Sequence, residues 1–481
     1  MSLRLTFDDV DRHVPVSRRE WIRIGGLAGL TLGQGLRSTT TRADELSSDL
    51  ARSPGFGRAK SVIVLYASGG QSQLETWDPK PEAPASIRGD FDSIATSNGA
   101  LRICEHLPQV ARFADRFTVV RSLSHDDLDH GSATYLSLTG QFHPKKSSNP
   151  PPRDDDAPVL GAILQRVAPA PRFPHTAVHV NGPLLVPEEP SPGQFGGFLG
   201  RKFDALTVGD VASSPVAIHG LEPQPELPLI RQNSRTSLLD AIDNTRRQLV
   251  GERQYLEMND LYRQAHTLLE SPRCRQAFDL DQEPVSLRDR YGRYRSGQAC
   301  LLARRLVQAG VPLITVFLSH TARGQDKSPD ETDQYGWDTH NDIFMALKTH
   351  LLPRFDNCFA ALLEDLERTG LLDSTLVICM GEFGRAPRVA LEPSFAGSTP
   401  GRKHWAAVYS IVMAGAGVHR GGVVGASDRI AAYPETTPLT PGDIAATIFH
   451  SLGIDSTKHY LDLAGRPWPI ATGKPILDLF S

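Results

Sequence analysis

The strongest constraint on the fold is a series of short apolar runs rich in β-branched residues. The first is Ser61–Ala67, which ends at Ser68-Gly69-Gly70, and similar runs follow at 118–123, 177–180, 311–318, 375–380 and 409–414. A run that is apolar throughout, without polar residues at alternate positions, is typical of a strand buried on both faces. The sequence therefore predicts a sheet covered on both sides.

Helical patterns separate several of these runs. One ends at Gly140, one at Gly310, one covers 343–369 before Gly370, and one covers 441–452. Strands that alternate with helices favour an α/β fold with a mostly parallel sheet. Residues 235–303 differ because they are polar and helix-periodic over a long stretch, and we interpret them as a mainly helical insertion packed on the main domain.

The first 48 residues do not resemble the rest of the chain. Arg18-Arg19 precedes a short, glycine-rich, mildly apolar stretch at 22–32, which is the pattern of a twin-arginine export signal. The alternative is a basic, disordered N-terminus on a cytosolic protein. We expect residues 1–48 to be signal and linker, residues 49–481 to be one domain, and the protein to use the twin-arginine export machinery and to be periplasmic or extracellular. No segment offers the roughly 20 apolar residues of a stable membrane span.

Composition excludes some classes of partner. The formal net charge is −4, and no basic stripe with interleaved aromatic residues is present, so the sequence does not favour nucleic acid as a partner. The five cysteines form no C-x-x-C pair, and we expect buried free thiols in place of disulfides or a zinc ribbon. The cysteines are Cys104, Cys274, Cys300, Cys358 and Cys379.

Polar residues with metal-binding chemistry follow several of the predicted strands. Asp338 and His340 come after the 311–318 run, Glu382 follows the 375–380 run directly, and His404 precedes the 409–414 run. Because parallel strands end at one edge of a sheet, these loops can converge there. Carboxylates and imidazoles together suit a divalent metal such as zinc or manganese.

Each of these residues also has a plain structural interpretation. The Asp338-x-His340 pair is a common surface pattern, Glu382 could pair with Arg385 or Arg388, and His404 could be a packed, hydrogen-bonded histidine. His130 follows several aspartates in a loop that could be a solvated acidic turn. No G-x-S-x-G, Walker or G-x-G-x-x-G pattern is present to suggest another chemistry.

Several motifs together resemble the family known as domain of unknown function 1501, whose members often begin with a twin-arginine signal. The resemblance covers nearly everything from residue 60 onward. The motifs that carry it are Ser68-Gly69-Gly70 through Thr76-x-Asp78-Pro79-Lys80, Glu105-His106-Leu107-Pro108, Arg121-Ser122-x-x-His125, Leu138-Thr139-Gly140, Asp289-Arg290-Tyr291-Gly292, Leu302-Ala303-Arg304-Arg305-Leu306, Trp337-Asp338-Thr339-His340, Gly381-Glu382-Phe383-Gly384-Arg385, Asp443-Ile444-Ala445-Ala446-Thr447-Ile448 and Gly465-Arg466-Pro467.

This family looks like a branch of the alkaline-phosphatase and sulfatase superfamily. The resemblance implies a three-layer α/β/α fold with metal ligands at the strand ends. His404 matches a late metal-binding histidine of the superfamily. His130 stands at the sulfatase nucleophile position, ten residues before Gly140, with Ser132 two residues later as a fallback nucleophile.

Three positions depart from the superfamily pattern. Ser68-Gly69 stands where a metal-binding aspartate usually ends the first strand, and Glu382-Phe383 stands in place of an Asp-His pair. A histidine at the nucleophile position is the third departure, and His130 could attack phosphorus or be a further ligand. The site therefore either holds a single metal through Asp338, His340, Glu382 and His404, or is degenerate and only binds.

Two functions compete at this stage. The first is an exported metal-dependent hydrolase of phosphate or sulfate esters, on a small-molecule or polysaccharide substrate, with zinc, manganese or calcium as cofactor and with Arg385 or Arg402 balancing charge. The second is a catalytically degenerate exported binding protein of the cell envelope on the same fold. A phosphoglycerate-mutase-like transferase fits the fold but not export, and fold alone does not decide function.

Overall fold

The structure is a computed structural model that describes residues 49–186, 188–212, 268, 271–319, 321–322 and 335–480. By its internal contacts the chain divides into two units, Met1–Arg52 and Ser53–Ser481. Every element named below belongs to the second unit. The predicted export signal lies outside the described residues, as does about half of the predicted insertion, including 235–267. In the described part of the chain, no helix has the length and apolar character to cross a membrane.

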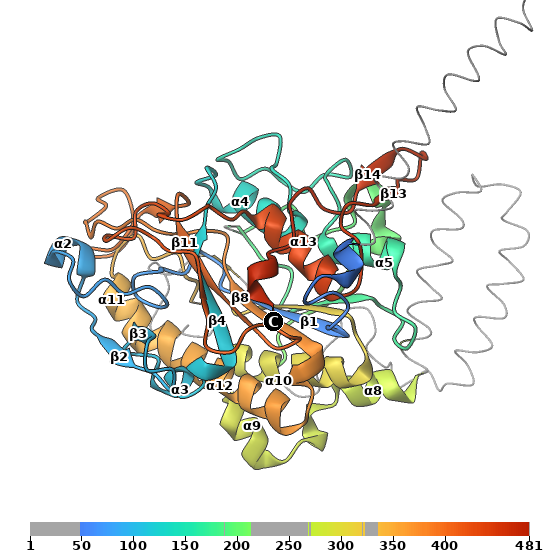
Figure 1. Cartoon of the computed structure of the whole chain (residues 1–481), viewed down its shortest axis with the longest axis horizontal. Coiled ribbons are helices and arrows are strands. Elements are labelled where there is room, and N and C mark those ends of the chain that lie inside the picture. Colours follow the sequence, from blue (N-terminus) through green and yellow to red (C-terminus); the bar gives the residue numbers. More distant parts are fainter. Residues whose placement is uncertain are drawn as a thin grey trace, which may run out of the picture. The chain divides into compact units, whose positions relative to one another are not determined.

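The centre of the second unit is an eight-stranded sheet (Figure 1). Its strands lie in the order β12-β4-β11-β8-β1-β7-β5-β6. Their bounds are β1 Ser61–Tyr66, β4 Phe117–Leu123, β5 Ala177–Val180, β6 Leu206–Val208, β7 Leu313–Phe317, β8 Thr375–Met380, β11 Tyr409–Ala414 and β12 Val423–Val424.

All neighbouring strands in this sheet are parallel except for β11, which runs antiparallel to both β4 and β8. In the middle of the sheet, Ile63 of β1 is in register with Ile314 of β7 and Val377 of β8. The structure thus confirms the predicted mostly parallel sheet. It also adds β6 and β12 at the two edges, short strands that the apolar pattern did not indicate.

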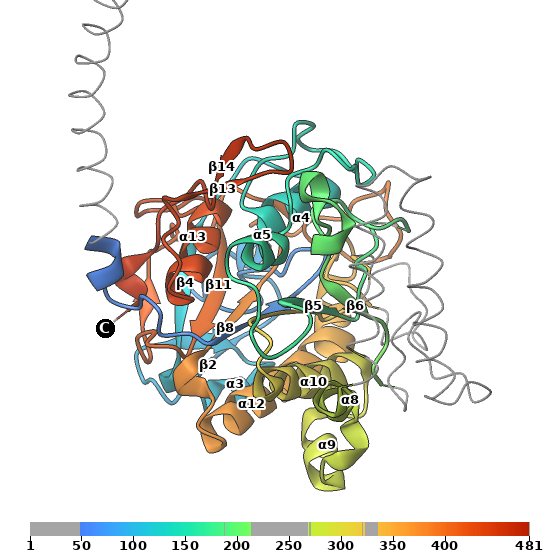
Figure 2. The same cartoon turned by 90° about the vertical axis from the view of Figure 1, so that its right-hand side faces the viewer.

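Both faces of the sheet are covered by helices, as the continuous apolar runs predict (Figures 1 and 2). Ile63 and Leu65 face one core, which contains residues of α10 and α12. The alternate residues of the same strand, including Val64 and Tyr66, face a second core with residues of α5 and α13. Successive side chains of a strand point to opposite faces, so one run supplies both cores. This confirms the three-layer α/β/α architecture.

The helices divide between the two faces. Below the sheet in Figure 1 lie α8, α9, α10 and α12, and above it lie α4, α5 and α13. The bounds are α2 Ala85–Arg88, α3 Pro108–Ala111, α4 His130–Thr139, α5 Leu160–Val167, α8 Pro272–Phe278, α9 Val285–Tyr291, α10 Arg295–Ala309, α11 Ile343–Ala346, α12 Leu352–Arg368 and α13 Pro441–Ser451. The helix α10 contacts β7 and α12 directly, so this end of the predicted insertion belongs to the main helical layer.

The helix predicted over 343–369 is interrupted. Between α11 and α12 lies a π-helical turn, Leu347–Leu351, and Pro353 stands at the start of α12. A proline has no N–H and its ring clashes with the carbonyl four residues earlier, so the helix cannot continue through it with regular hydrogen bonds. By contrast, the predicted ends at Gly140 and Gly310 are confirmed, because both residues cap their helices in the left-handed conformation.

Three two-stranded ribbons accompany the sheet in the described ranges. They pair β2 (Ser93–Ala95) with β3 (Arg102–Cys104), β9 (Gly384–Arg385) with β10 (His404–Trp405), and β13 (His459–Leu461) with β14 (Pro467–Pro469). The second ribbon matters for the site, since it follows β8 and its register sets His404 opposite Arg385.

Candidate metal centre

The segment that carries Asp338 and His340 is fastened to the end of β1. The Trp337 amide donates to the Ser68 carbonyl at 2.8 Å, and the Asp338 amide donates to the Ala322 carbonyl at 3.0 Å. Gly69 makes this contact possible. It has a φ of 113°, and a Cβ at this position would lie 2.3 Å from the Asp338 amide nitrogen. The glycine after β1 therefore allows the 337–340 segment to approach the strand end.

Three side chains from distant parts of the chain meet there. The Asp338 Oδ1 atom lies 3.1 Å from His340 Nε2 and 3.2 Å from His404 Nε2. The two Nε2 atoms are themselves 2.9 Å apart. Donor atoms bound to one metal at about 2.0–2.1 Å are separated by about 3 Å. Asp338, His340 and His404 are therefore already spaced as ligands of a single ion.

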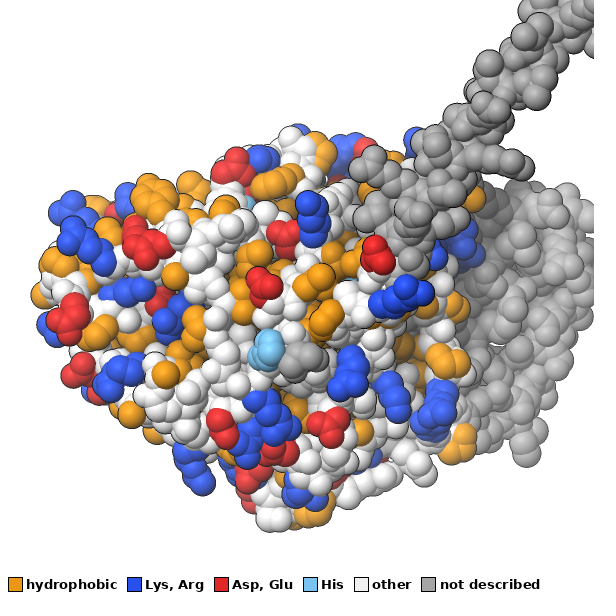
Figure 3. Space-filling model, viewed as in Figure 1, with side chains coloured by type: hydrophobic (Ala, Val, Ile, Leu, Met, Phe, Trp, Pro, Cys, Tyr) orange, Lys and Arg blue, Asp and Glu red, His pale blue; other side chains and the backbone are white. Residues whose placement is uncertain are grey.

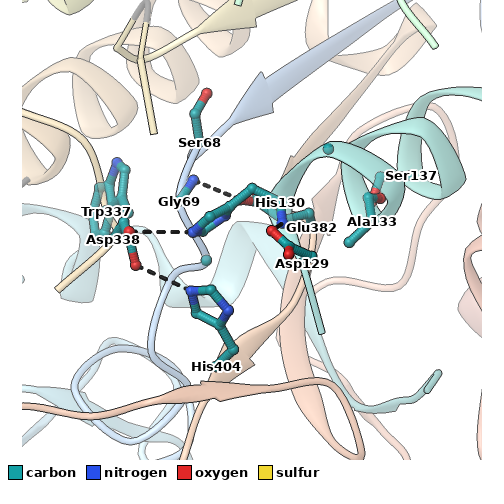
Figure 4. Close-up of polar contacts among 12 residues, drawn as sticks. Ser68, Gly69, Asp129, His130, Ala133, Ser137, Trp337, Asp338, Glu382 and His404 are labelled. Carbon is teal, nitrogen blue, oxygen red and sulfur yellow. Dashed lines mark hydrogen bonds and ion pairs between the residues drawn. The ribbon is translucent and has the colours of Figure 1, made fainter. Parts of the chain in front are cut away.

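A fourth side chain, His130, joins this group from the first residue of α4 (Figure 4). Its Nε2 atom lies 3.3 Å from Asp338 Oδ2. The ligand atoms of His130, Asp338 and His404 all lie within 4.8 Å of one another. The N-cap Asp129 accepts a bond of 2.9 Å from the His130 amide and so fixes where α4 begins.

Glu382 does not face the other three predicted ligands but stands behind His130. Its Oε1 atom is 2.7 Å from His130 Nδ1 and accepts from the Gly69 amide at 2.8 Å. A carboxylate can only accept, so His130 Nδ1 donates and Nε2 is left to face Asp338. A histidine ligand oriented in this way by a carboxylate is a common arrangement in metal sites.

The electrostatics of the cluster favour a cation. Burial lowers the pKa of His130, but Asp338 and Glu382 outweigh it and raise that pKa to about 9. Burial tends to raise the pKa of Asp338, yet His130 and Arg385 hold it well below its usual range. Burial, reinforced by the charge of His130, lowers the pKa of His404 to about 4. The pKa of His340 is lowered as well, chiefly by burial. The neutral imidazoles of His340 and His404 and the ionised carboxylate of Asp338 are the forms that ligate metals, whereas His130 would have to release its proton to bind one.

His130 also faces Asp338 directly. His130 Nε2 is buried, and its partner is Asp338 Oδ2 at 3.3 Å, an ion pair that does not meet hydrogen-bond geometry among the described residues. A divalent cation between His130 and Asp338 would replace this ion pair, with the imidazole nitrogen and the carboxylate oxygen as its ligands. The residues present therefore fit a metal held by three imidazoles and one carboxylate.

The two arginines near the site are buried structural cations. Arg385 donates to Asp338 Oδ1 at 2.7 Å and to backbone carbonyls that include Gly70 at 3.0 Å. Arg402 pairs with the buried carboxylate of Glu75, with an Nε–Oε2 distance of 3.0 Å. The structure thus places Arg385 as the charge partner of Asp338.

Ser132 lies outside the cluster. Its hydroxyl donates to Asp127 Oδ1 at 2.6 Å and accepts from the Ser148 amide at 3.2 Å, and its side chain is fully buried in α4. Sequence reasoning missed two other contacts of the site: His125 Nε2 lies 2.7 Å from the Glu382 carbonyl oxygen, and Phe395 stacks on His340. No local pattern signals these contacts, because the partners are far apart in the sequence. His125 and Glu382 are 257 residues apart, and His340 and Phe395 are 55 residues apart.

Some solved structures resemble this chain weakly. The sulfatase PsFucS1 from Pseudoalteromonas sp. is 13% identical, and the match covers 88% of this chain and 72% of that one at a TM-score of 0.38. The phosphonate monoester hydrolase SpPMH from Silicibacter pomeroyi is 13% identical, with 88% and 77% covered and a TM-score of 0.38. A mutant of TAB5 alkaline phosphatase is 11% identical, with 82% and 97% covered and a TM-score of 0.32. These TM-scores are too low to carry an activity over to this chain.

The sequence comparisons identify the family of the chain. No curated protein matches the chain significantly. The model of one family, described as proteins of unknown function, matches residues 59–480, which span every strand of the sheet and every residue of the metal centre. The chain therefore belongs to the DUF1501 family.

Proposed function

We propose that this protein is a metal-dependent hydrolase of phosphate or sulfate esters that acts after export. The observation that carries the proposal is the convergence of Asp338, His340 and His404 on one point, with His130 beside them. Perturbed ionisable groups that gather at the end of a central sheet are typical of catalytic sites.

The donor set narrows the choice of metal. Three imidazole nitrogens and one carboxylate oxygen suit zinc or manganese, whereas calcium prefers oxygen ligands alone. We assign Asp338, His340, His404 and His130 as the ligands. Glu382, which sequence reasoning placed among the ligands, acts in this proposal through His130 instead, since its Oε1 atom is 2.7 Å from His130 Nδ1.

A divalent ion held there would polarise the oxygens of an ester and lower the pKa of a bound water. The protein's own residues prepare the site in other ways. Glu382 keeps the His130 ring turned toward Asp338. Arg385 forms an ion pair with Asp338 and so offsets the negative charge of this buried carboxylate. The twin arginines of the N-terminal segment support export, and the substrate class remains a small-molecule or polysaccharide ester.

A second candidate is an exported protein of the cell envelope that binds a ligand and has no catalytic turnover. It is favoured by the surroundings of Ser132, the alternative nucleophile. The Ser132 hydroxyl is buried, donates to Asp127 and accepts from the Ser148 amide, so it is not placed to attack a substrate. In that case the metal centre would anchor a ligand or stabilise the fold.

The first experiment is elemental analysis of the protein purified without added metal, for the wild type and for His404→Ala. We expect about one equivalent of zinc or manganese in the wild type and a loss of most of it in the variant. His419→Ala is the matched control, because His419 is an exposed histidine outside the cluster.

A screen of phosphate and sulfate esters then separates the two candidates. Metal together with hydrolysis that His404→Ala abolishes supports the enzyme, and metal without hydrolysis of any ester supports the binding protein. A folded wild-type protein that neither contains nor takes up a divalent metal would contradict the proposal.

A further inference from the structure

The three imidazoles of the metal centre are oriented in different ways. His404 Nδ1 lies 2.7 Å from the Leu128 carbonyl oxygen, and His130 Nδ1 lies 2.7 Å from Glu382 Oε1. His340 Nδ1 is buried and has no hydrogen-bond partner among the described residues. Metal-binding histidines usually owe their ring orientation to a hydrogen bond on the second nitrogen. His340 lacks such a hydrogen bond among the described residues, so another contact must orient its ring.

Phe395 supplies a contact of a different kind. Its ring lies parallel to the His340 ring, with centroids 3.8 Å apart and an angle of 6° between the planes. His340 is 5% exposed and Phe395 is 42% exposed, so Phe395 covers His340 on the solvent side. Stacking of this type adds about 0.5–1.5 kcal/mol beyond the area buried.

The backbone around Phe395 is held against the segment that carries His340. The Asn341 side chain donates to the carbonyls of Phe395 at 3.2 Å and Glu392 at 2.9 Å, and it accepts from the Glu392 amide at 2.8 Å. The next residue, Asp342, accepts from the amides of Ser398 and Thr399. Residues 341 and 342 therefore clamp both ends of the 392–399 loop.

We infer that Phe395 is a positioning residue for the metal ligand His340, and that the 392–399 loop and the metal centre stabilise each other. Stacking holds the plane of the imidazole, and in that plane Nε2 faces Asp338 Oδ1 and His404 Nε2. Metal binding, in turn, fixes the ring on which the loop packs, so the two events are linked and the coupling is reciprocal. This inference rests on the metal centre of the proposed function.

The test measures the affinity of the whole protein for Zn²⁺ by competition with a chromophoric chelator. Phe395→Leu keeps an apolar side chain without a flat ring, and Phe395→Tyr keeps the ring. We expect Phe395→Leu to weaken Zn²⁺ binding at least 10-fold, within the range known for residues that orient ligands. We expect Phe395→Tyr to bind within twofold of the wild type. Both variants should fold, because Phe395 is partly exposed and lies in a loop.

Two further measurements separate positioning from a general effect. Phe198→Leu is the control, since Phe198 stacks on Trp468 at 4.6 Å in the described structure and neither residue belongs to the metal centre. Substitution of Co²⁺ for Zn²⁺ should give an altered visible spectrum in Phe395→Leu only. Amide hydrogen exchange in residues 392–399 should slow when Zn²⁺ is added to the wild type.

The possible outcomes are distinct. If the wild-type protein binds no Zn²⁺, the proposed metal centre fails and the inference fails with it. If the wild type binds Zn²⁺ but Phe395→Leu binds equally well with an unchanged Co²⁺ spectrum, the metal centre stands and the positioning role of Phe395 is overturned.

Discussion

At the scale of single residues, the proposed metal centre depends on a glycine as much as on its proposed ligands. Gly69 ends the β1 segment with a φ of 113°, and its backbone amide donates to Glu382 while its missing side chain leaves room for Asp338. One residue thus links the carboxylate behind His130 with the segment that carries two ligands. Any side chain at this position would have to displace the 337–340 segment.

Gly69→Ala is therefore expected to lose metal and stability together. The added Cβ would meet the Asp338 amide at 2.3 Å, and the positive φ adds backbone strain, so the free energy of unfolding should fall by about 2 kcal/mol or more. Urea unfolding and metal content measure the two effects. Gly99→Ala is the control, since no atom lies within 4 Å of its added Cβ. Equal metal content in the two variants would show that the close approach at Gly69 is dispensable.

At the scale of elements, the strands inside the sheet were predictable because they are buried on both faces. The runs at 177–180, 375–380 and 409–414 match β5, β8 and β11 residue for residue. The short edge strands β6 and β12 were not predictable, since three and two residues carry too little pattern. The π-helical turn before Pro353 was signalled only by the proline.

One strand also carries a buried titratable group that is not among the proposed ligands. His179 of β5 is 3% exposed and packs edge-on against Phe317, and burial lowers the pKa of His179 to about 4. The unfolded chain has a histidine pKa of about 6.5. Between these two pH values the histidine is protonated in the unfolded state and neutral in the folded state. The contribution of His179 to the free energy of unfolding is therefore complete above about pH 6.5 and decreases as the pH falls toward 4.

We expect the free energy of unfolding to fall by about 1.4 kcal/mol per pH unit on account of this residue across that window. In urea unfolding experiments between pH 7 and pH 4.5, the free energy of unfolding of His179→Leu should decrease less per pH unit than that of the wild type. His419→Ala, at an exposed histidine, should leave the slope unchanged. A slope in His179→Leu equal to that of the wild type would contradict the burial argument.

At the scale of the whole unit, basic and acidic side chains are interspersed on the face that Figure 3 shows. The five cysteines are all buried and free, as composition and spacing predicted. They lie in β3, α8, α10, α12 and β8, and all five belong to the one core that also contains Ile63 and Leu65. Burial raises the pKa of the Cys104 thiol to about 12 and that of the Cys379 thiol well above its usual range.

The native protein should therefore resist thiol reagents. Only the thiolate reacts readily, and buried thiols with raised pKa values are inert. Ellman's reagent is expected to find almost no accessible thiol in the folded protein at pH 8 and five thiols in denaturant. Rapid modification of one thiol in the folded protein would reveal a local opening of its layer.

The sequence by itself determined the class of fold and the chemistry available to the site. Uniformly apolar runs separated by helical segments permit few arrangements other than a covered parallel sheet, because every backbone group in such a run must be paired and both of its faces must be buried. The residues Asp338, His340 and His404 could be selected from their place after or before those runs.

Tertiary structure alone decided which polar residues meet. His404 is 66 residues from Asp338, and only the β9–β10 ribbon brings it to the strand ends. The role of Glu382 behind His130, and not beside Asp338, depends on where α4 begins relative to β8. Distances of about 3 Å between side chains from four separate segments are set by the packing of the whole unit, which local sequence patterns do not encode.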